Sequence, residues 1–294
     1  MSCSSIIVEI QKTSKEEKRL PRRYQNPYLQ LDSHYLWVPY TQKERRVRIL
    51  LPKDYHENLE KTYPVLYMFD GQNVFHSREA YAGHSWKVIP HLKQNPQIPD
   101  LMIVAIDNDG EQRLNEYTPW PMNPSEVEKT QQIGGLGRAH AKWLVEAVKP
   151  FVDRNYRTQT VKERTFLAGS SLGGLMTAYI GAAYPTVFGV LGVFSLASWV
   201  NDQAFLDYLT HHPLESDTKV YLQVGTQEGN DEDQAFTERN VNQMYLDSSL
   251  WYYQTLLRTD HPLDNIWFRI QADETHSEAY WALHFGEFLV YSCQ

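Results

Sequence analysis

Short apolar runs separated by segments of helical periodicity constrain the fold of this chain most. A strand that is buried on both faces reads as a continuous apolar run. Strands that alternate with helices indicate a mostly parallel sheet with helices on both faces. The sequence therefore predicts an α/β fold, with strands at 63–69, 101–106, 166–168, 190–194, 220–224 and 266–270 and helices at 141–152, 175–184, 236–257 and 278–291.

The beginning of the chain has a different pattern. Apolar and polar residues alternate over 29–51, which predicts an antiparallel pair of strands with its turn at 41–44. Residues 1–28 are polar and charged, and we interpret them as an arm. Because no internal repeat or low-complexity linker follows, residues 29–294 are predicted to form a single α/β domain.

Composition excludes several classes of partner. The net charge is −8 and there is no long basic run, so nucleic acid is not an expected partner. No apolar stretch reaches the roughly 18 residues of a membrane-spanning helix, and the apolar patch at 6–8 is too short for a signal peptide. With only Cys3 and Cys293, we expect a cytoplasmic protein without membrane or nucleic-acid partners. The sequence leaves open whether it forms homo-oligomers.

A Gly-x-Ser-x-Gly motif lies between a predicted strand and a predicted helix. Gly169 and Gly173 flank Ser171, so no side chain crowds the tight turn that a nucleophile elbow requires. The helix that starts at Leu172 would direct its free N–H groups at the space above Ser171. The motif predicts that Ser171 is a nucleophile and that the Leu172 N–H stabilises an oxyanion.

A serine nucleophile needs a base, which follows it in the chain order of α/β-hydrolases. Five histidines come after Ser171, namely His211, His212, His261, His276 and His284. Only His276 directly follows the last predicted strand and precedes the last helix, at the sheet edge of Ser171. We therefore predict His276 as the general base.

The acid that orients this base should follow the strand at 220–224. Glu228 lies between two glycines there and is the preferred candidate, with Asp231 as the alternative. A third possibility is that Ser171 works with His276 alone. The second oxyanion N–H should come from the turn after the strand at 63–69, which assigns Gln72, with Gly71 as the alternative. Asp70 is interpreted as fixing this turn through backbone hydrogen bonds.

Four motifs in this order resemble the putative esterase family of α/β-hydrolases, at residues 66–75, 113–120, 155–158 and 168–175. This group includes esterase D-like enzymes, feruloyl esterases, enterobactin-type siderophore esterases and mycolyltransferases, and the enterochelin-esterase-like branch is the most similar. The resemblance implies a Ser-His-acid triad and no metal or organic cofactor. Siderophore esterases carry basic residues for an acidic substrate, and here only Arg113 and Arg138 are candidates near the site.

Further residues are candidates for substrate binding. The long segment 108–137 would rise from the strand end nearest Ser171 and is a candidate lid. The predicted substrate-binding residues are Trp86, Arg113, Glu116, Tyr117 and Trp120.

The sequence thus predicts a serine carboxylesterase that hydrolyses a small acyl or aryl ester through an acyl-enzyme. Three alternatives keep the same triad: an acyltransferase, a thioesterase or a siderophore esterase. An alternative of another class is a non-catalytic binding protein with a hydrolase fold. A metallohydrolase is not supported, because the chain lacks His-Glu-x-x-His and any other tight cluster of ligands.

Overall fold

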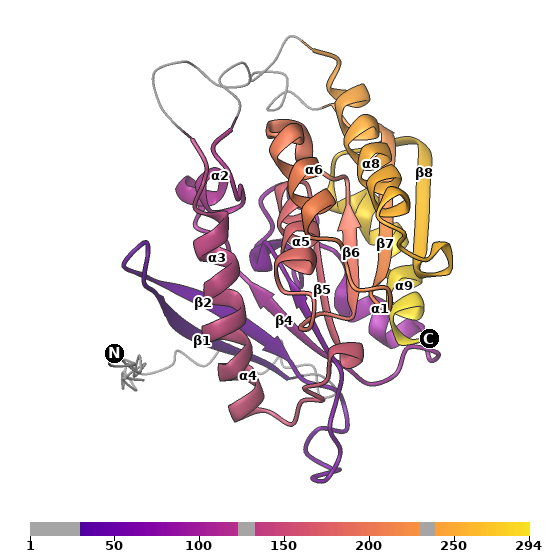
Figure 1. Cartoon of the computed structure of the whole chain (residues 1–294). Helices are drawn as coiled ribbons and strands as arrows, with labels where there is room; N and C mark the ends of the chain where they lie inside the picture. Colours follow the sequence, from indigo (N-terminus) through magenta and orange to yellow (C-terminus); the bar gives the residue numbers. More distant parts are fainter. Residues whose placement is uncertain (1–29, 123–132, 230–238) are drawn as a thin grey trace.

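The computed structural model describes residues 30–122, 133–229 and 239–294 (Figure 1). Eight strands form one sheet. β1 pairs antiparallel with β2 and β2 with β4, whereas the remaining neighbours are parallel. The predicted mostly parallel sheet with an antiparallel N-terminal pair is confirmed. In spatial order the strands are β1 (Leu31–Val38), β2 (Lys43–Leu50), β4 (Met102–Ile106), β3 (Val65–Met68), β5 (Thr165–Ser170), β6 (Val190–Phe194), β7 (Lys219–Gln227) and β8 (Ile266–Thr275).

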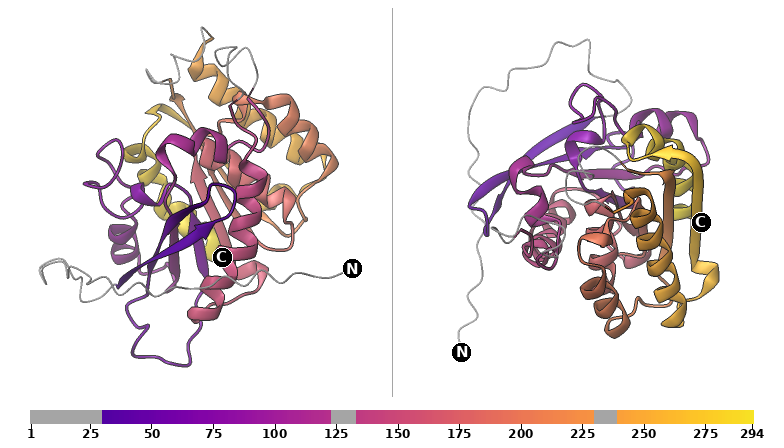
Figure 2. Two further views of the ribbon diagram at one scale, coloured as in Figure 1. Left: turned by 90° about the vertical axis from the view of Figure 1, so that its left-hand side faces the viewer. Right: turned by 90° about the horizontal axis from the view of Figure 1, so that it is seen from above.

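Helices cover both faces of the sheet (Figure 2). The shorter layer consists of α1 (Val88–Gln94) and α9 (Glu278–Cys293). The larger layer consists of α3 (Gly137–Trp143), α4 (Lys149–Asn155), α5 (Leu172–Ala183), α6 (Asp202–His211) and α8 (Val241–Arg258). A further short helix, α2 (Arg113–Glu116), precedes α3.

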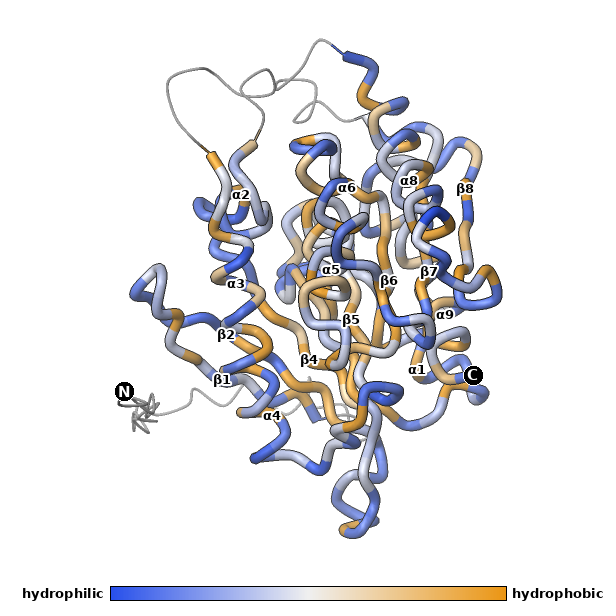
Figure 3. The backbone as a smooth tube through the Cα atoms, viewed as in Figure 1, coloured by the Kyte–Doolittle hydropathy of each residue, from blue (hydrophilic) through white to orange (hydrophobic). Residues whose placement is uncertain are grey.

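Each helix layer shares a hydrophobic core with one face of the sheet. Along β3, Val65 and Tyr67 contribute to the core under the larger layer, whereas Leu66 and Met68 contribute to the core under α1 and α9. Both faces of the strand are therefore buried, which explains why its sequence reads as a continuous apolar run. Figure 3 shows the same hydrophobic character along the other central strands.

Some helices differ from the predicted ones. The helix predicted at 141–152 contains a π-helical turn, Leu144–Val148, between α3 and α4. The helix predicted at 236–257 begins at Val241, where the Asn240 side chain accepts a hydrogen bond from the Gln243 N–H. Helices α1 and α6 were not predicted. In α6 the only buried hydrophobic residues are Phe205 and Leu209, so its apolar pattern is weak.

Parts of four sequence predictions lie outside the described residues. They are the arm at 1–28, residues 123–132 of the candidate lid, residues 236–238 of the helix predicted at 236–257, and the alternative acid Asp231. A β-bridge between Pro121 and Gly134 joins the two described ends of the candidate lid. Across the described ranges, no helix combines the length and the apolar character needed to span a membrane.

Candidate active site

Ser171 occupies the sharp turn between β5 and α5. Its backbone has φ 58° and ψ −126°, a conformation that L-residues rarely adopt. The Ser171 N–H donates to the Phe194 carbonyl at 2.9 Å, and the Ser171 carbonyl accepts from the Ala197 N–H at 3.3 Å. A Cβ on Gly169 would lie 2.6 Å from the carbonyl carbon of Gly173, so the turn excludes a side chain at 169. The local geometry is that of a nucleophile elbow.

His276 and Glu228 meet at the same edge of the sheet, after β8 and β7 respectively. His276 Nδ1 lies 2.8 Å from Glu228 Oε2, and the Glu228 side chain is 1% exposed. With Nδ1 donating to the carboxylate, Nε2 is left as the nitrogen that can accept a proton. The alternative acid, Asp231, lies outside the described residues.

Glu228 is also hydrogen-bonded through its other oxygen. Ser195 Oγ and the Gly225 N–H each donate to Glu228 Oε1 at 2.6 Å. Ser195 follows β6 and lies between Phe194 and Ala197, whose backbones hold the Ser171 turn. The segment 194–197 therefore connects the elbow to the histidine–carboxylate pair, because its backbone bonds to Ser171 and the Ser195 side chain donates to Glu228.

The turn after β3 packs directly against the elbow. We call residues 70–73 the oxyanion loop; Gly71–Asn73 form a 3₁₀ turn in it. A Cβ on Gly173 would lie 3.2 Å from Phe69 Cβ and 3.4 Å from Asp70 Oδ2. The Gln72 N–H thus belongs to the loop that borders the N-terminus of α5, where Leu172 lies. Their assignment as oxyanion donors stays a prediction.

Asp70 fixes this loop through its backbone, as the sequence indicated, because its carbonyl accepts from the Asn73 N–H at 2.8 Å. Its side chain makes no capping hydrogen bond to the 3₁₀ turn. Instead, Arg113 donates to both carboxylate oxygens at 2.8 Å, and Asn108 Nδ2 donates to Oδ1 at 2.5 Å. The buried Tyr117 hydroxyl accepts from the Asp70 N–H at 3.3 Å. Arg113 and Tyr117 therefore lie at the site, where they support the oxyanion loop.

Two other predicted substrate-binding residues, Trp86 and Glu116, are enclosed by protein. Trp86 is 2% exposed and packs in the core beneath α9, with its ring 5.7 Å from that of Trp281. Glu116 is fully buried and accepts two hydrogen bonds from Arg45 at 2.9 Å. Such burial contradicts a direct substrate contact for Trp86 and Glu116, because their side chains are already enclosed by protein.

Trp120 is half-buried. It packs edge-on against Tyr179 and Tyr208, and the Arg138 guanidinium lies 5.6 Å from its ring. Arg138, the second basic candidate of the sequence analysis, is thus engaged with this aromatic group.

Sequence reasoning missed several residues around His276. Tyr245 from α8 places its hydroxyl 3.5 Å from His276 Nε2, and the Trp281 ring lies edge-on to the imidazole at 4.9 Å. Trp281 Nε1 also donates to Ser195 Oγ at 2.8 Å. Ser195 alone had a usable signal, because it directly follows a parallel strand at the edge of the sheet where the other candidates lie.

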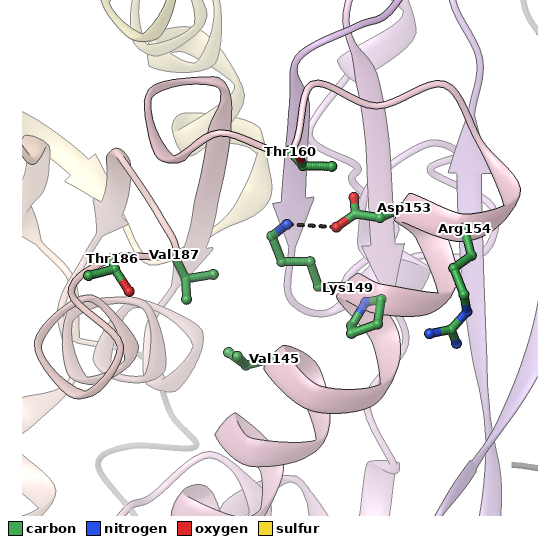
Figure 4. Close-up of a pocket in the computed structure, with 8 residues that line it drawn as sticks. Val145, Lys149, Asp153, Arg154, Thr160, Thr186 and Val187 are labelled. Carbon is green, nitrogen blue, oxygen red and sulfur yellow. Dashed lines mark hydrogen bonds and ion pairs between the residues drawn. The ribbon is translucent and has the colours of Figure 1, made fainter. Parts of the chain in front are cut away.

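A cleft of about 390 Å³ lies elsewhere, between α4 and the segment after α5 (Figure 4). Its wall includes the ion pair Lys149–Asp153 and Thr186, which follows the C-terminal end of α5. Because α5 begins at Leu172, directly after Ser171, this cleft lies at the opposite end of α5 from the elbow. Within the described ranges, no group of three or more His, Cys, Asp or Glu side chains is arranged to hold a metal ion.

Comparisons with known proteins agree with the fold. The uncharacterized protein YbbA of Bacillus subtilis is 24% identical over 242 residues, 82% of this chain and 89% of its own. The iron(III) enterobactin esterase of Escherichia coli is 30% identical over 158 residues, which cover 53% of this chain and 33% of that enzyme. A ferulic acid esterase of known structure superposes with a TM-score of 0.67 at 18% identity, covering 91% of this chain and 98% of that one.

The family model covers nearly the whole described sheet. The model of the putative esterase family matches residues 39–289, from the turn after β1 into α9. This range includes the elbow, both residues of the histidine–carboxylate pair and the oxyanion loop. The chain belongs to the putative esterase family.

Proposed function

We propose that this protein is a serine carboxylesterase that hydrolyses a small acyl or aryl ester with Ser171, His276 and Glu228 as its triad. The observation that carries the proposal is the 2.8 Å contact between His276 Nδ1 and Glu228, connected through Ser195 to the strained turn of Ser171. A base oriented by a buried carboxylate, beside a serine in an elbow, is the arrangement that activates a hydroxyl for attack on a carbonyl.

The reaction begins when Ser171 Oγ attacks the ester carbonyl carbon and its proton passes to His276 Nε2. The Leu172 and Gln72 N–H groups stabilise the negative oxygen that forms. The bond to the alcohol oxygen then breaks, and His276 gives its proton to the departing alcohol. Water attacks the acyl-enzyme with His276 as the base, the carboxylic acid leaves, and Ser171 recovers its proton.

The surroundings of the site favour an uncharged ester over a strongly anionic one. Arg113 is already paired with Asp70, and the Arg138 guanidinium lies 5.6 Å from the Trp120 ring. These are the two cations that the sequence analysis nominated for an acidic siderophore. The similarity to a ferulic acid esterase supports an aryl ester as the substrate. The similarity to the enterobactin esterase is the reason to retain a siderophore ester as an alternative substrate.

The test combines labelling with turnover. A fluorophosphonate probe followed by peptide mapping should label Ser171, and short-chain p-nitrophenyl esters should be hydrolysed. Ser171→Ala should abolish labelling and lower kcat at least about 1,000-fold, because loss of a triad nucleophile removes the covalent pathway. Ser170→Ala, a change of the adjacent buried serine, is the matched control and should still be labelled.

Two results would contradict the proposal. Near-normal turnover by Ser171→Ala would remove the nucleophile assignment. A wild-type protein that neither reacts with the probe nor turns over acyl, aryl and siderophore-type esters would favour the binding-protein alternative. Product analysis with added alcohols or thiols separates hydrolysis from acyl transfer.

A further inference from the structure

A hydrogen bond joins the oxyanion loop to the beginning of α9. Asn73 Nδ2 donates to Glu278 Oε1 at 2.6 Å, across 205 positions of sequence. Both residues are buried, at 6% and 8% exposed. Asn73 follows Gln72 directly, and Glu278 comes two residues after His276. The bond therefore spans two loops that reach the elbow from different strands, β3 and β8.

The remaining polar atoms of Asn73 are committed to its own loop. Asn73 Oδ1 accepts from the Tyr81 N–H at 3.0 Å, and the Asn73 carbonyl accepts from the Trp86 N–H at 3.0 Å. Its backbone N–H donates to the Asp70 carbonyl at 2.8 Å. These bonds fix the orientation of the Asn73 amide, so the position of Glu278 is defined relative to the oxyanion loop.

Glu278 is a costly group to bury at this place. Among the described residues it has no ion pair with lysine or arginine; the Asn73 amide is its side-chain partner. Burial raises the pKa of the Glu278 carboxyl and the nearby Asp70 carboxylate adds to this, while its own backbone N–H and His276 act in the opposite direction. A buried carboxyl that is only partly compensated does not add stability in the way that an apolar residue would.

We propose that Asn73 and Glu278 are a positioning pair that sets the oxyanion loop relative to His276, an inference that rests on the proposed function. Ser171 and Leu172 are adjacent in the elbow and move together. The Gln72 N–H and His276 Nε2 belong to separate loops. In the transition state both must lie within a fraction of an ångström of their productive positions around the substrate. The Asn73–Glu278 bond is a direct connection between these two loops.

The sharpest test exchanges the donor and the acceptor of the Asn73–Glu278 hydrogen bond. Asn73→Asp places two carboxyl groups against each other, and kcat should fall about 10- to 100-fold because the loops separate. Adding Glu278→Gln should restore kcat to within about threefold of the wild type, since the new amide can donate to the new carboxylate. KM should change little in either variant, because ground-state binding does not depend on the oxyanion N–H groups.

Glu278→Gln alone tests the charge separately. The groups that face Glu278 are His276, Asp70 with its partner Arg113, and the neutral Asn73 amide. Glutamine keeps an oxygen that can accept from the Asn73 amide, so kcat should stay within about threefold of the wild type. Glu278→Ala removes this acceptor, and kcat should fall while KM changes little, a split that a merely structural role would not produce.

Controls separate positioning from folding and from the proposed function. Rates are normalised to active sites titrated with the fluorophosphonate, and Tm is measured for each variant. Glu287→Gln removes a carboxylate from the same helix, where it pairs with Arg269, and should leave kcat unchanged.

The outcomes are distinct. The positioning proposal is overturned if Asn73→Asp keeps wild-type kcat per active site, or if the double variant recovers Tm but not kcat. If the wild type itself neither labels at Ser171 nor turns over esters, it is the proposed function that has failed. If Asn73→Asp does not fold, Glu278→Ala still decides, because it removes the acceptor of the Asn73 amide: an unchanged kcat per active site overturns the proposal.

Discussion

His276 and His284 each contact a glutamate at 2.8 Å, and their side chains are almost equally buried, at 10% and 11% exposed. Both glutamates also accept a hydrogen bond from β7. The Gly225 N–H donates to Glu228, and Gln223 Nε2 donates to Glu274 at 3.1 Å. Gly225 lies between the two pairs. A Cβ on this residue would collide with the Glu274 carbonyl oxygen and would lie 3.1 Å from Glu228 Oε1.

The two pairs differ in which ring nitrogen meets the carboxylate. His276 uses Nδ1, and its Nε2 lies beside the Tyr245 hydroxyl at the site. His284 uses Nε2, the outer nitrogen, and contacts both oxygens of Glu274. An imidazole whose outer nitrogen is already bound has no exposed acceptor to offer a serine. The comparison teaches that burial and a carboxylate partner do not distinguish His276 from His284, whereas the ring nitrogen that contacts the carboxylate does.

The largest expected effect separates the two histidines directly. His276→Ala should lower kcat at least about 1,000-fold, as expected for loss of a triad base. His284→Ala should leave kcat within about threefold, but lower the free energy of unfolding by roughly 1–3 kcal/mol because Glu274 loses a partner. Ester turnover and urea denaturation measure the two quantities. Equal losses of kcat in both variants would make the distinction between the pairs wrong.

A smaller effect tests the support of Glu228. Ser195→Ala should lower kcat about tenfold, the equivalent of roughly 1.4 kcal/mol for one hydrogen bond to a charged group. The Trp281 N–H also loses its acceptor, so the free energy of unfolding should fall by roughly 1–3 kcal/mol. Ser292→Ala, another buried serine, is the matched control. An unchanged kcat in Ser195→Ala would show that Glu228 is held adequately without Ser195.

The smallest effect concerns the second carboxylate. Glu274→Gln should leave kcat within about twofold, since Glu274 contacts neither His276 nor the elbow in the described hydrogen bonds. The free energy of unfolding should fall by roughly 1 kcal/mol, because a charged partner of His284 becomes neutral. A loss of kcat with an unaltered Tm would instead indicate that the two pairs are coupled through Gly225.

Much of the fold was predictable because its signals are local. The apolar runs marked the central strands, and the run at 190–194 coincides with β6, Val190–Phe194. The elbow was recognisable from Gly169, Ser171 and Gly173, since the turn restricts those positions directly. The pairing of His276 with Glu228 followed from topology, because both residues come after parallel strands that end at one sheet edge.

The misplaced residues depended on partners far away in the sequence. Glu116 was assigned to substrate binding, but its partner Arg45 is 71 positions earlier on β2. Trp86 was assigned to a substrate pocket, but in the folded protein its ring packs against the rings of Trp281 and Phe285. The Asn73–Glu278 bond has the same character. Neither composition nor spacing carries information on such contacts, which exist only after the sheet has assembled.

The position of β8 at the edge of the sheet has a consequence for how activity is lost. This strand carries the loop with His276 and pairs only with β7, whereas the strand before Ser171 has a partner on each side. Edge elements open locally at a lower free energy than the centre of a sheet. If the proposed function holds, warming should detach His276 while Ser171 stays in its turn, so that activity is lost at a lower temperature than Tm.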